Sequence, residues 1–217
     1  MPPRECQPEP RQREIHVRHV CSVIPLVLAT LAVAAVPAEA QYRRYGFIGA
    51  GIGGVEHDYY ESDFTLSAGY LARFGPEVGV YVGIRTPLTY SRFTPDAEAL
   101  LDSLGASSGS VEGGAATVVE SGIEAVAGYD TGALGGYGWA GIHYLSETRN
   151  DGTITTPGGP RPLAQRSRTD FGPSYGAGLQ FRFGRSAAVF TEWYRSAGFD
   201  DRMLRMSGLR FGVTGQF

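Results

Sequence analysis

The chain has 217 residues, with 19 basic (Lys and Arg) and 22 acidic residues and a net charge of −3 at pH 7. This near balance produces no strongly positive field, which argues against a nucleic-acid-binding protein. Glycine is in excess, since its 31 residues are about twice the ~7% share of an average protein. The glycines fall inside segments that alternate between apolar and polar side chains, which is typical of narrow β-structures.

Residues 1–40 are predicted to be a signal peptide that is cleaved on export. An uncharged apolar run at residues 21–37 follows three arginines and precedes Ala38-Glu39-Ala40, a small-x-small cleavage pattern. The run is marginal in length for a membrane span, so a retained anchor is the less favoured alternative. Cleavage would remove four arginines and four acidic residues and leave the net charge at −3. It would also remove both cysteines, Cys6 and Cys21, so the domain at residues 41–217 would have no disulfide and no cysteine-based metal site.

After Gln41, eight alternating segments are predicted to be β-strands. Each reaches the ~9–11 residues that a tilted strand needs to cross the hydrocarbon layer of a membrane. The predicted strands are Tyr45–His57, Phe64–Phe74, Val78–Phe93, Thr117–Gly128, Leu134–Thr148, Thr169–Phe183, Ala187–Gly198 and Met203–Phe217.

Short and long connections alternate between these strands. The short ones lie at residues 75–77, 129–133 and 184–186 and are rich in turn-forming residues. The long, polar ones lie at His57–Asp63, Thr94–Ala116, Arg149–Arg168 and Phe199–Arg202. The second long connection is predicted to hold a helical turn at Ala97–Leu104 before a flexible Ser/Gly stretch, and the third is predicted to be mobile. This rhythm indicates a barrel with turns at one end and loops at the other.

Strand periodicity assigns each side chain to a face. In the third strand Val80, Ile84 and Leu88 are predicted to point outward, and Tyr81 and Arg85 inward. Aromatic residues near the strand ends predict two outward girdles. They are Phe74, Tyr129, Phe181, Phe183 and Phe217 at the turn end, and Phe64, Tyr90, Phe93 and Tyr144 at the loop end.

The same periodicity sends seven charged residues inward, where they are predicted to form an ion-pair network that fills the lumen. Arginine suits such a network because its planar fork holds two carboxylates at once. The alternative is a polar path for protons or small ions. The seven residues are Arg73, Arg85, Glu120, Glu124, Arg182, Glu192 and Arg210.

The last strand carries the clearest family pattern. Leu209, Phe211, Val213 and the terminal Phe217 alternate with polar residues, and this pattern resembles the C-terminal assembly signal of small outer-membrane β-barrels of the OmpA/OmpX and opacity-protein type. Gly215 departs from that signal, because a large residue is commoner there.

The resemblance implies an eight-stranded antiparallel transmembrane β-barrel in the outer membrane. Its implied role is structural or surface-interacting (adhesion-like), with no cofactor, and its specificity lies in the loops. The implied partners are outer-membrane lipids, lipopolysaccharide and the barrel-assembly machinery.

Other functions remain open as alternatives. The runner-up is a narrow channel or porin for small solutes or ions, although an eight-stranded barrel is only just wide enough for side chains to fill. A soluble periplasmic barrel of lipocalin type would instead turn its apolar faces inward.

A lipid-modifying enzyme is the third alternative. The lipid A deacylases of this architecture carry His-x-Ser on one strand face, whereas here His143 and Ser146 are three residues apart and point to opposite faces. We therefore expect no catalytic site and interpret His57 and His143 as rim residues hydrogen-bonded to loop carboxylates.

Two loop clusters are weaker candidates for ligand sites. His57, Asp58, Glu61 and Asp63 lack the spacing of a metal site and are predicted to be a solvated acidic loop. Arg161, Arg166 and Arg168 could contact lipopolysaccharide phosphates, or could form a basic loop with no specific contact.

Overall fold

The computed structural model describes residues 42–55, 59–184, 186–199 and 204–217. The predicted signal peptide lies outside these residues, as do His57, Asp58 and Met203. The described part of the chain holds no helix with the length and apolar character that a membrane-spanning helix needs.

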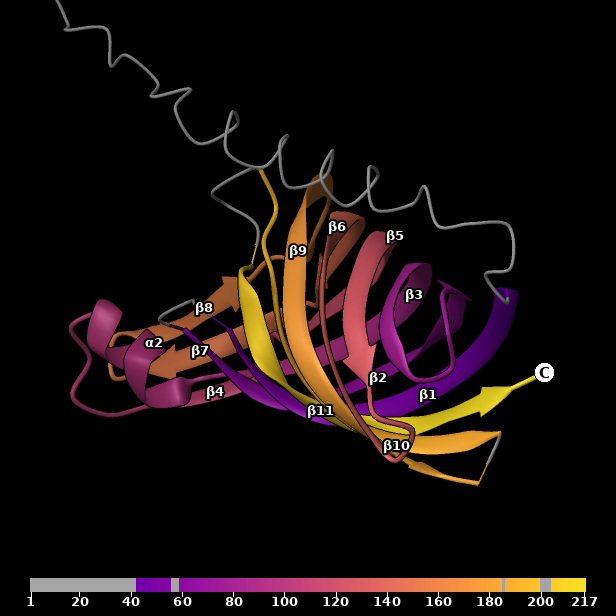
Figure 1. Cartoon of the computed structure of the whole chain (residues 1–217). Coiled ribbons are helices and arrows are strands. Elements are labelled where there is room, and N and C mark those ends of the chain that lie inside the picture. The colour runs from indigo at the N-terminus through magenta and orange to yellow at the C-terminus, as the bar shows by residue number, and fades with distance from the viewer. Residues whose placement is uncertain (1–41, 56–58, 185, 200–203) are drawn as a thin grey trace, which may run out of the picture. The chain divides into compact units, whose positions relative to one another are not determined.

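Eight long strands close into one antiparallel barrel (Figure 1). Their order around the barrel is β1-β11-β10-β9-β6-β5-β3-β2, and β2 pairs back with β1. Each predicted segment overlaps one of these strands, so the predicted fold class is confirmed. The strands are β1 (Tyr42–Val55), β2 (Tyr60–Phe74), β3 (Gly79–Pro95), β5 (Ala116–Asp130), β6 (Leu134–Arg149), β9 (Arg166–Phe183), β10 (Ala187–Ser196) and β11 (Met206–Gln216).

The three short connections lie where they were predicted. Each contains a glycine with positive φ, at Gly75 (131°), Gly132 (97°) and Gly184 (74°), a conformation that favours a residue without a Cβ atom. In the second turn, the Gly132 amide also donates to Asp130 Oδ1 at 2.8 Å. These turns define the turn end of the barrel.

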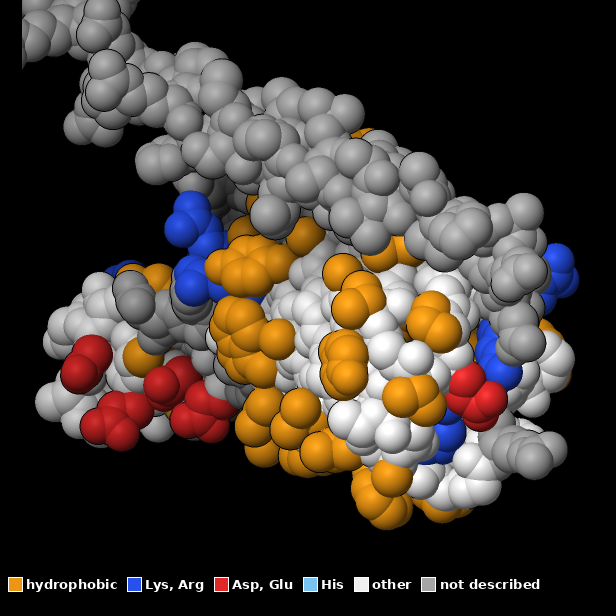
Figure 2. Space-filling model, viewed as in Figure 1, with side chains coloured by type: hydrophobic (Ala, Val, Ile, Leu, Met, Phe, Trp, Pro, Cys, Tyr) orange, Lys and Arg blue, Asp and Glu red, His pale blue; other side chains and the backbone are white. Residues whose placement is uncertain are grey.

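The two faces of the barrel wall follow the predicted periodicity. Val80, Ile84 and Leu88 are exposed on the outside, whereas Tyr81 and Arg85 are buried inside. Figure 2 shows orange hydrophobic side chains spread over the barrel wall. An apolar exterior around a charged interior is the reverse of a lipocalin-type barrel, so that alternative is wrong.

Of the nine aromatic residues assigned to the girdles, Phe93 was misplaced. It is only 1% exposed and lies in the interior core, while the other eight are exposed. Phe93 shares its parity in β3 with the inward-facing Tyr81 and Arg85, and strand pleating therefore places it inside.

Two of the predicted loops contain regular structure. The helix α2 (Ala97–Ser103) confirms the predicted helical turn, and the Asp96 side chain caps it by accepting from the Ala99 amide at 3.1 Å. Beyond it, β4 (Ser110–Gly113), β7 (Gly152–Thr156) and β8 (Gly159–Leu163) form a three-stranded sheet in the order β4-β7-β8. Both connections therefore contain regular structure that the sequence pattern did not predict.

We call α2, β4, β7 and β8 together the extension. It belongs to the loop end of the barrel, because its elements are inserted between β3 and β5 and between β6 and β9 (Figure 1). Acidic side chains gather over α2 and β4 in Figure 2. The exposed acidic residues of this region are Glu98, Asp102, Glu112 and Asp151.

Candidate functional site: the polar interior of the barrel

The structure places all seven predicted lumen residues on the inner face of the barrel. Six of them are 5% exposed or less, and Arg182 is the seventh, with 8% of its side chain exposed. Burial of this kind costs free energy unless each charge finds a partner. The pairing of these side chains therefore decides what the lumen can do.

A strut across the lumen forms the centre of the network. Arg85 on β3 donates through Nη1 to Glu192 Oε2 on β10 at 2.6 Å. These two strands lie four places apart in either direction around the barrel, so the ion pair joins opposite walls. The Arg85 Nε also donates to Glu124 on the neighbouring strand β5. One guanidinium thus holds two carboxylates, as predicted for arginine at such sites.

Arg210 completes the centre. Its Nε donates to Glu192 Oε1 at 2.6 Å, so both oxygens of Glu192 accept from arginines. Its Nη1 reaches Thr89 Oγ1 at 3.3 Å. Of the three glutamates predicted to face inward, Glu120, Glu124 and Glu192, the structure pairs Arg210 with Glu192.

A second cluster lies at the turn end and is organised by Asp130, which the sequence pattern assigns only to a turn. Asp130 Oδ2 accepts from Arg73 Nη1 at 2.9 Å and from Arg182 Nη2 at 2.6 Å. Gln180 Nε2 donates to the same oxygen at 3.1 Å. Asp130 is 1% exposed, so it lies in the barrel interior with the predicted residues.

With Asp130, the acids of this predicted set equal its arginines in number, and Glu147 is a further buried acid. The seven predicted residues are four arginines and three glutamates, and Asp130 supplies the fourth acid. Arg73 is further held by the carbonyls of Pro76 and Glu77, at 2.8 and 3.1 Å, and lies over the Tyr81 ring at 4.0 Å. The cluster therefore ties the first short turn to the wall of the barrel.

His143 lies inside the barrel, so its interpretation as a rim residue was wrong. The side chain is 2% exposed, and its Nε2 lies 3.1 Å from Glu124 Oε1. Its ring stacks on Trp139 with an interplanar angle of 5°. His143 shares the inward parity of Leu145 and Glu147, which β6 also buries. Its other ring nitrogen, Nδ1, has no hydrogen-bond partner among the described residues.

Hydroxyl groups occupy the interior on the loop side of these ion pairs. Glu120 accepts from the Ser196 hydroxyl. Thr65 Oγ1 lies 3.0 Å from Ser91 Oγ and 3.1 Å from Tyr194 Oη, which links β2 to β3 and β10. Each of these residues is buried. The network therefore continues across the lumen as hydrogen bonds between hydroxyl groups.

An apolar cap covers the network at the loop end. Phe93, Leu145, Leu204 and Met206 are each 1% exposed or less and belong to one packed cluster. The Leu204 amide donates to Glu147 Oε2 at 3.0 Å. The end of the β10–β11 connection is thereby fixed in the mouth of the barrel.

Glycines make room for the largest interior side chains. A Cβ atom added at Gly176 would lie 2.7 Å from the Trp139 ring, and one at Gly178 would lie 2.6 Å from Tyr137. This close approach gives a reason for part of the glycine excess.

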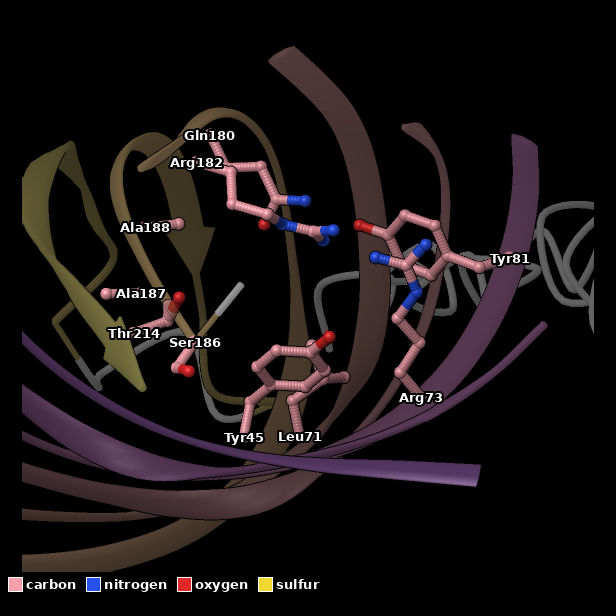
Figure 3. A pocket seen from close by; sticks show the side chains of 10 residues that line it. All are labelled: Tyr45, Leu71, Arg73, Tyr81, Gln180, Arg182, Ser186, Ala187, Ala188 and Thr214. Atoms are coloured by element: carbon pink, nitrogen blue, oxygen red, sulfur yellow. The ribbon is translucent and has the colours of Figure 1, made fainter. Parts of the chain in front are cut away.

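The cavities left in the interior are small. Figure 3 shows one at the turn end, where the Arg73 and Arg182 guanidinium groups point toward each other near the Tyr81 hydroxyl. It has a volume of about 20 Å³, and a second, beside Arg85 and Tyr137, has about 30 Å³. Each has room for about one or two ordered waters.

The other candidate residues lie outside the lumen. Leu209, Phe211, Val213 and Phe217 are exposed on the outer face of β11 and at its end. Arg161 and Arg166 are exposed on β8 and at the start of β9, and Arg168 is half-buried. Among the described residues, no three His, Cys, Asp or Glu side chains are grouped as metal ligands would be.

Comparison with solved structures gives similar barrels. A major outer membrane protein from Thermus thermophilus matches with a TM-score of 0.53 and 12% identity, over 81% of this chain and 99% of that one. At this identity the match shows a shared fold alone.

Two further matches have lower TM-scores. Ail, the attachment invasion locus protein of Yersinia pestis, solved with the heparin analogue sucrose octasulfate, has a TM-score of 0.47 and 14% identity over 82% of this chain and 99% of Ail. The N-terminal β-barrel domain of Pseudomonas aeruginosa OprF has a TM-score of 0.46 and 14% identity over 82% of this chain and 100% of that domain. No protein-family model and no curated protein matches the sequence.

Proposed function

We propose that this chain is an integral outer-membrane β-barrel with a structural or surface-interaction role, whose lumen is closed by the Arg/Glu network. The observation that carries this proposal is the polarity of the barrel: ion pairs inside, and apolar side chains such as Ile84 and Leu179 exposed outside. Such a surface is stable in lipid and would aggregate in water.

The backbone supports the same location. Closure of β1 onto β11 leaves no open edge in the barrel, which a bilayer requires because it offers no water to unpaired backbone groups. The strands have 10 to 18 residues, enough for the ~9–11 that span the hydrocarbon layer at a tilt. The shared fold with the Thermus outer membrane protein agrees with this environment.

In this proposal the barrel is a scaffold, and the extension is the part that meets other molecules. The short turns would face the periplasm, and α2 with its small sheet would face outward. The extension carries exposed charges of both signs, such as Glu98, Asp102 and Arg161, which suits polar partners at the cell surface.

Gel mobility and fractionation test the location. The protein is expected in the outer-membrane fraction, and unboiled samples should migrate differently from boiled samples, because a closed barrel resists unfolding by detergent. Recovery in the soluble fraction, or identical migration before and after boiling, would overturn the proposal.

A further inference from the structure

A shallow apolar groove crosses the outer wall where the barrel closes. It has a volume of about 590 Å³ and extends from β11 over β1 and β2 to β3. Its floor consists of small outward-facing residues, Gly46, Ala68 and Gly215. Ile48 and Leu88 are among its walls. We call this feature the seam groove.

Two glycines lie side by side in the seam groove. Gly46 on β1 pairs directly with Gly215 on β11, and the next outward pair along the seam is Ile48 with Val213. A Cβ atom added at Gly215 would meet nothing within 4 Å, whereas one added at Gly46 would lie 3.0 Å from the Phe217 ring, so the open part of the floor is at Gly215. The missing side chain at Gly215 therefore leaves a hollow beside the outward-facing Ile48 and Val213.

The turn end of the groove has the residues that a lipid headgroup region favours. The Phe217 and Tyr70 rings meet edge to face there, with centroids 6.0 Å apart. Arg44 is exposed on the same outward face of β1, two residues from Gly46, which is about 7 Å along a strand. The Phe217 amide donates to the Arg44 carbonyl at 3.3 Å, so the aromatic pair and the arginine are neighbours.

We propose that the seam groove binds one phospholipid, with an acyl chain on the glycine floor and the phosphate at Arg44. An acyl chain matches an apolar, elongated hollow that continues the outward apolar band. A phosphate matches the planar guanidinium, and aromatic rings favour the depth between the two. This inference rests on the proposed membrane location, because in the proposed orientation the turn end faces the inner leaflet.

Native mass spectrometry of refolded protein tests the site. The probe is 1-palmitoyl-2-oleoyl phosphatidylglycerol added to protein in detergent micelles. We expect one lipid to remain bound at collision energies that remove all others. Gly215→Phe should lose this lipid because the ring fills the groove.

Gly136→Phe is the matched control. Gly136 also faces outward near the turn end, on β6, and a Cβ atom there would make only an ordinary contact of 3.6 Å with Leu179. This variant should keep the lipid. Arg44→Gln should weaken retention of phosphatidylglycerol and leave that of the phosphate-free diacylglycerol with the same chains unchanged.

Several results would overturn the proposal. They are equal retention by the native protein and Gly215→Phe, loss in Gly136→Phe as well, an Arg44→Gln substitution that changes the retention of both lipids to the same extent, or a protein dimer in place of the lipid adduct. Heat-modifiable mobility is measured on the same samples. A native barrel that is heat-modifiable but holds no lipid refutes the lipid site alone, whereas loss of heat-modifiability refutes the membrane barrel itself.

Discussion

Glu192 and Arg210 face each other directly across strands β10 and β11, with the Arg210 Nε donating to Glu192 Oε1 at 2.6 Å. The other oxygen of Glu192 accepts from Arg85 on the opposite wall. Glu192 on β10 therefore links β11 and β3 through ion pairs inside the barrel.

Glu192→Gln should strongly destabilise the barrel, because it leaves the buried Arg210 without a carboxylate and leaves Arg85 with Glu124 alone. Removal of one partner from a buried ion pair costs about 3–5 kcal/mol. The loss is measured as a lower midpoint of unfolding in urea, with gel mobility reporting the fraction of folded protein. Glu98→Gln on the exposed surface of α2 is the control and should leave the midpoint unchanged.

The double variant Glu192→Gln, Arg85→Gln should be less destabilised than the sum of its single variants, because the two side chains are in direct contact. Additive effects would show that the direct Arg85–Glu192 contact contributes no coupling energy.

Planar bilayers should show no steady ohmic openings for the native protein. The strut, the Asp130 cluster and the cap around Leu204 fill the lumen, and its cavities hold about one or two waters each. Steady openings of the native protein that Arg85→Ser or Arg210→Ser abolishes would favour the channel over the closed lumen.

Single cysteines introduced at the two ends of the barrel should react with a maleimide from opposite sides of the membrane. Both natural cysteines lie in the predicted signal peptide, so the cleaved protein would carry no other thiol. Ser107→Cys, beside the extension, should react with a membrane-impermeant maleimide in intact cells. Thr131→Cys, in the second short turn, should react only after the outer membrane is permeabilised. The reverse pattern would invert the proposed orientation, and labelling of the unmodified protein would refute cleavage.

Phe217→Ala should lower the amount of barrel found in the outer membrane of cells while changing the unfolding midpoint of refolded protein little. The ring is 71% exposed, so its loss removes little packing, whereas the predicted assembly signal depends on it. Phe199→Ala, at a similarly exposed phenylalanine near the loop end, is the control for cell-surface yield. Equal yields of both variants would argue against an assembly role for Phe217.

The period of two in the sequence was sufficient to predict the eight strands and most of their faces. The same period places the Phe93 side chain inside the barrel, because Phe93 has the parity of Arg85. Its position near a strand end suggested a girdle, but parity decides the direction of a side chain regardless of its depth.

Pairing inside the lumen could not be predicted, because it depends on which strands oppose each other. Arg85 and Glu192 are 107 residues apart, and no local pattern relates them. Asp130 was missed because an aspartate two residues before a glycine is typical of turns. Its Oδ1 does accept from the Gly132 amide in the turn, while its Oδ2 accepts from Arg73 in the lumen.

The small sheet escaped detection for a different reason. Its strands have four or five residues, too few for alternation to stand out, and β8 includes Pro160 and Pro162. Proline lacks the amide hydrogen of a strand and usually argues against one, except at an edge. β8 is such an edge, since it pairs with β7 alone.

The sheet β4-β7-β8 draws its strands from two separate connections, and β4 pairs with β7 along Ser110–Gly113. An antibody raised against this end of the protein would therefore recognise a discontinuous epitope. A synthetic peptide that copies the first connection alone would lack β7 and β8, and one that copies the second would lack β4. A vaccine or display antigen therefore needs both connections on an intact barrel.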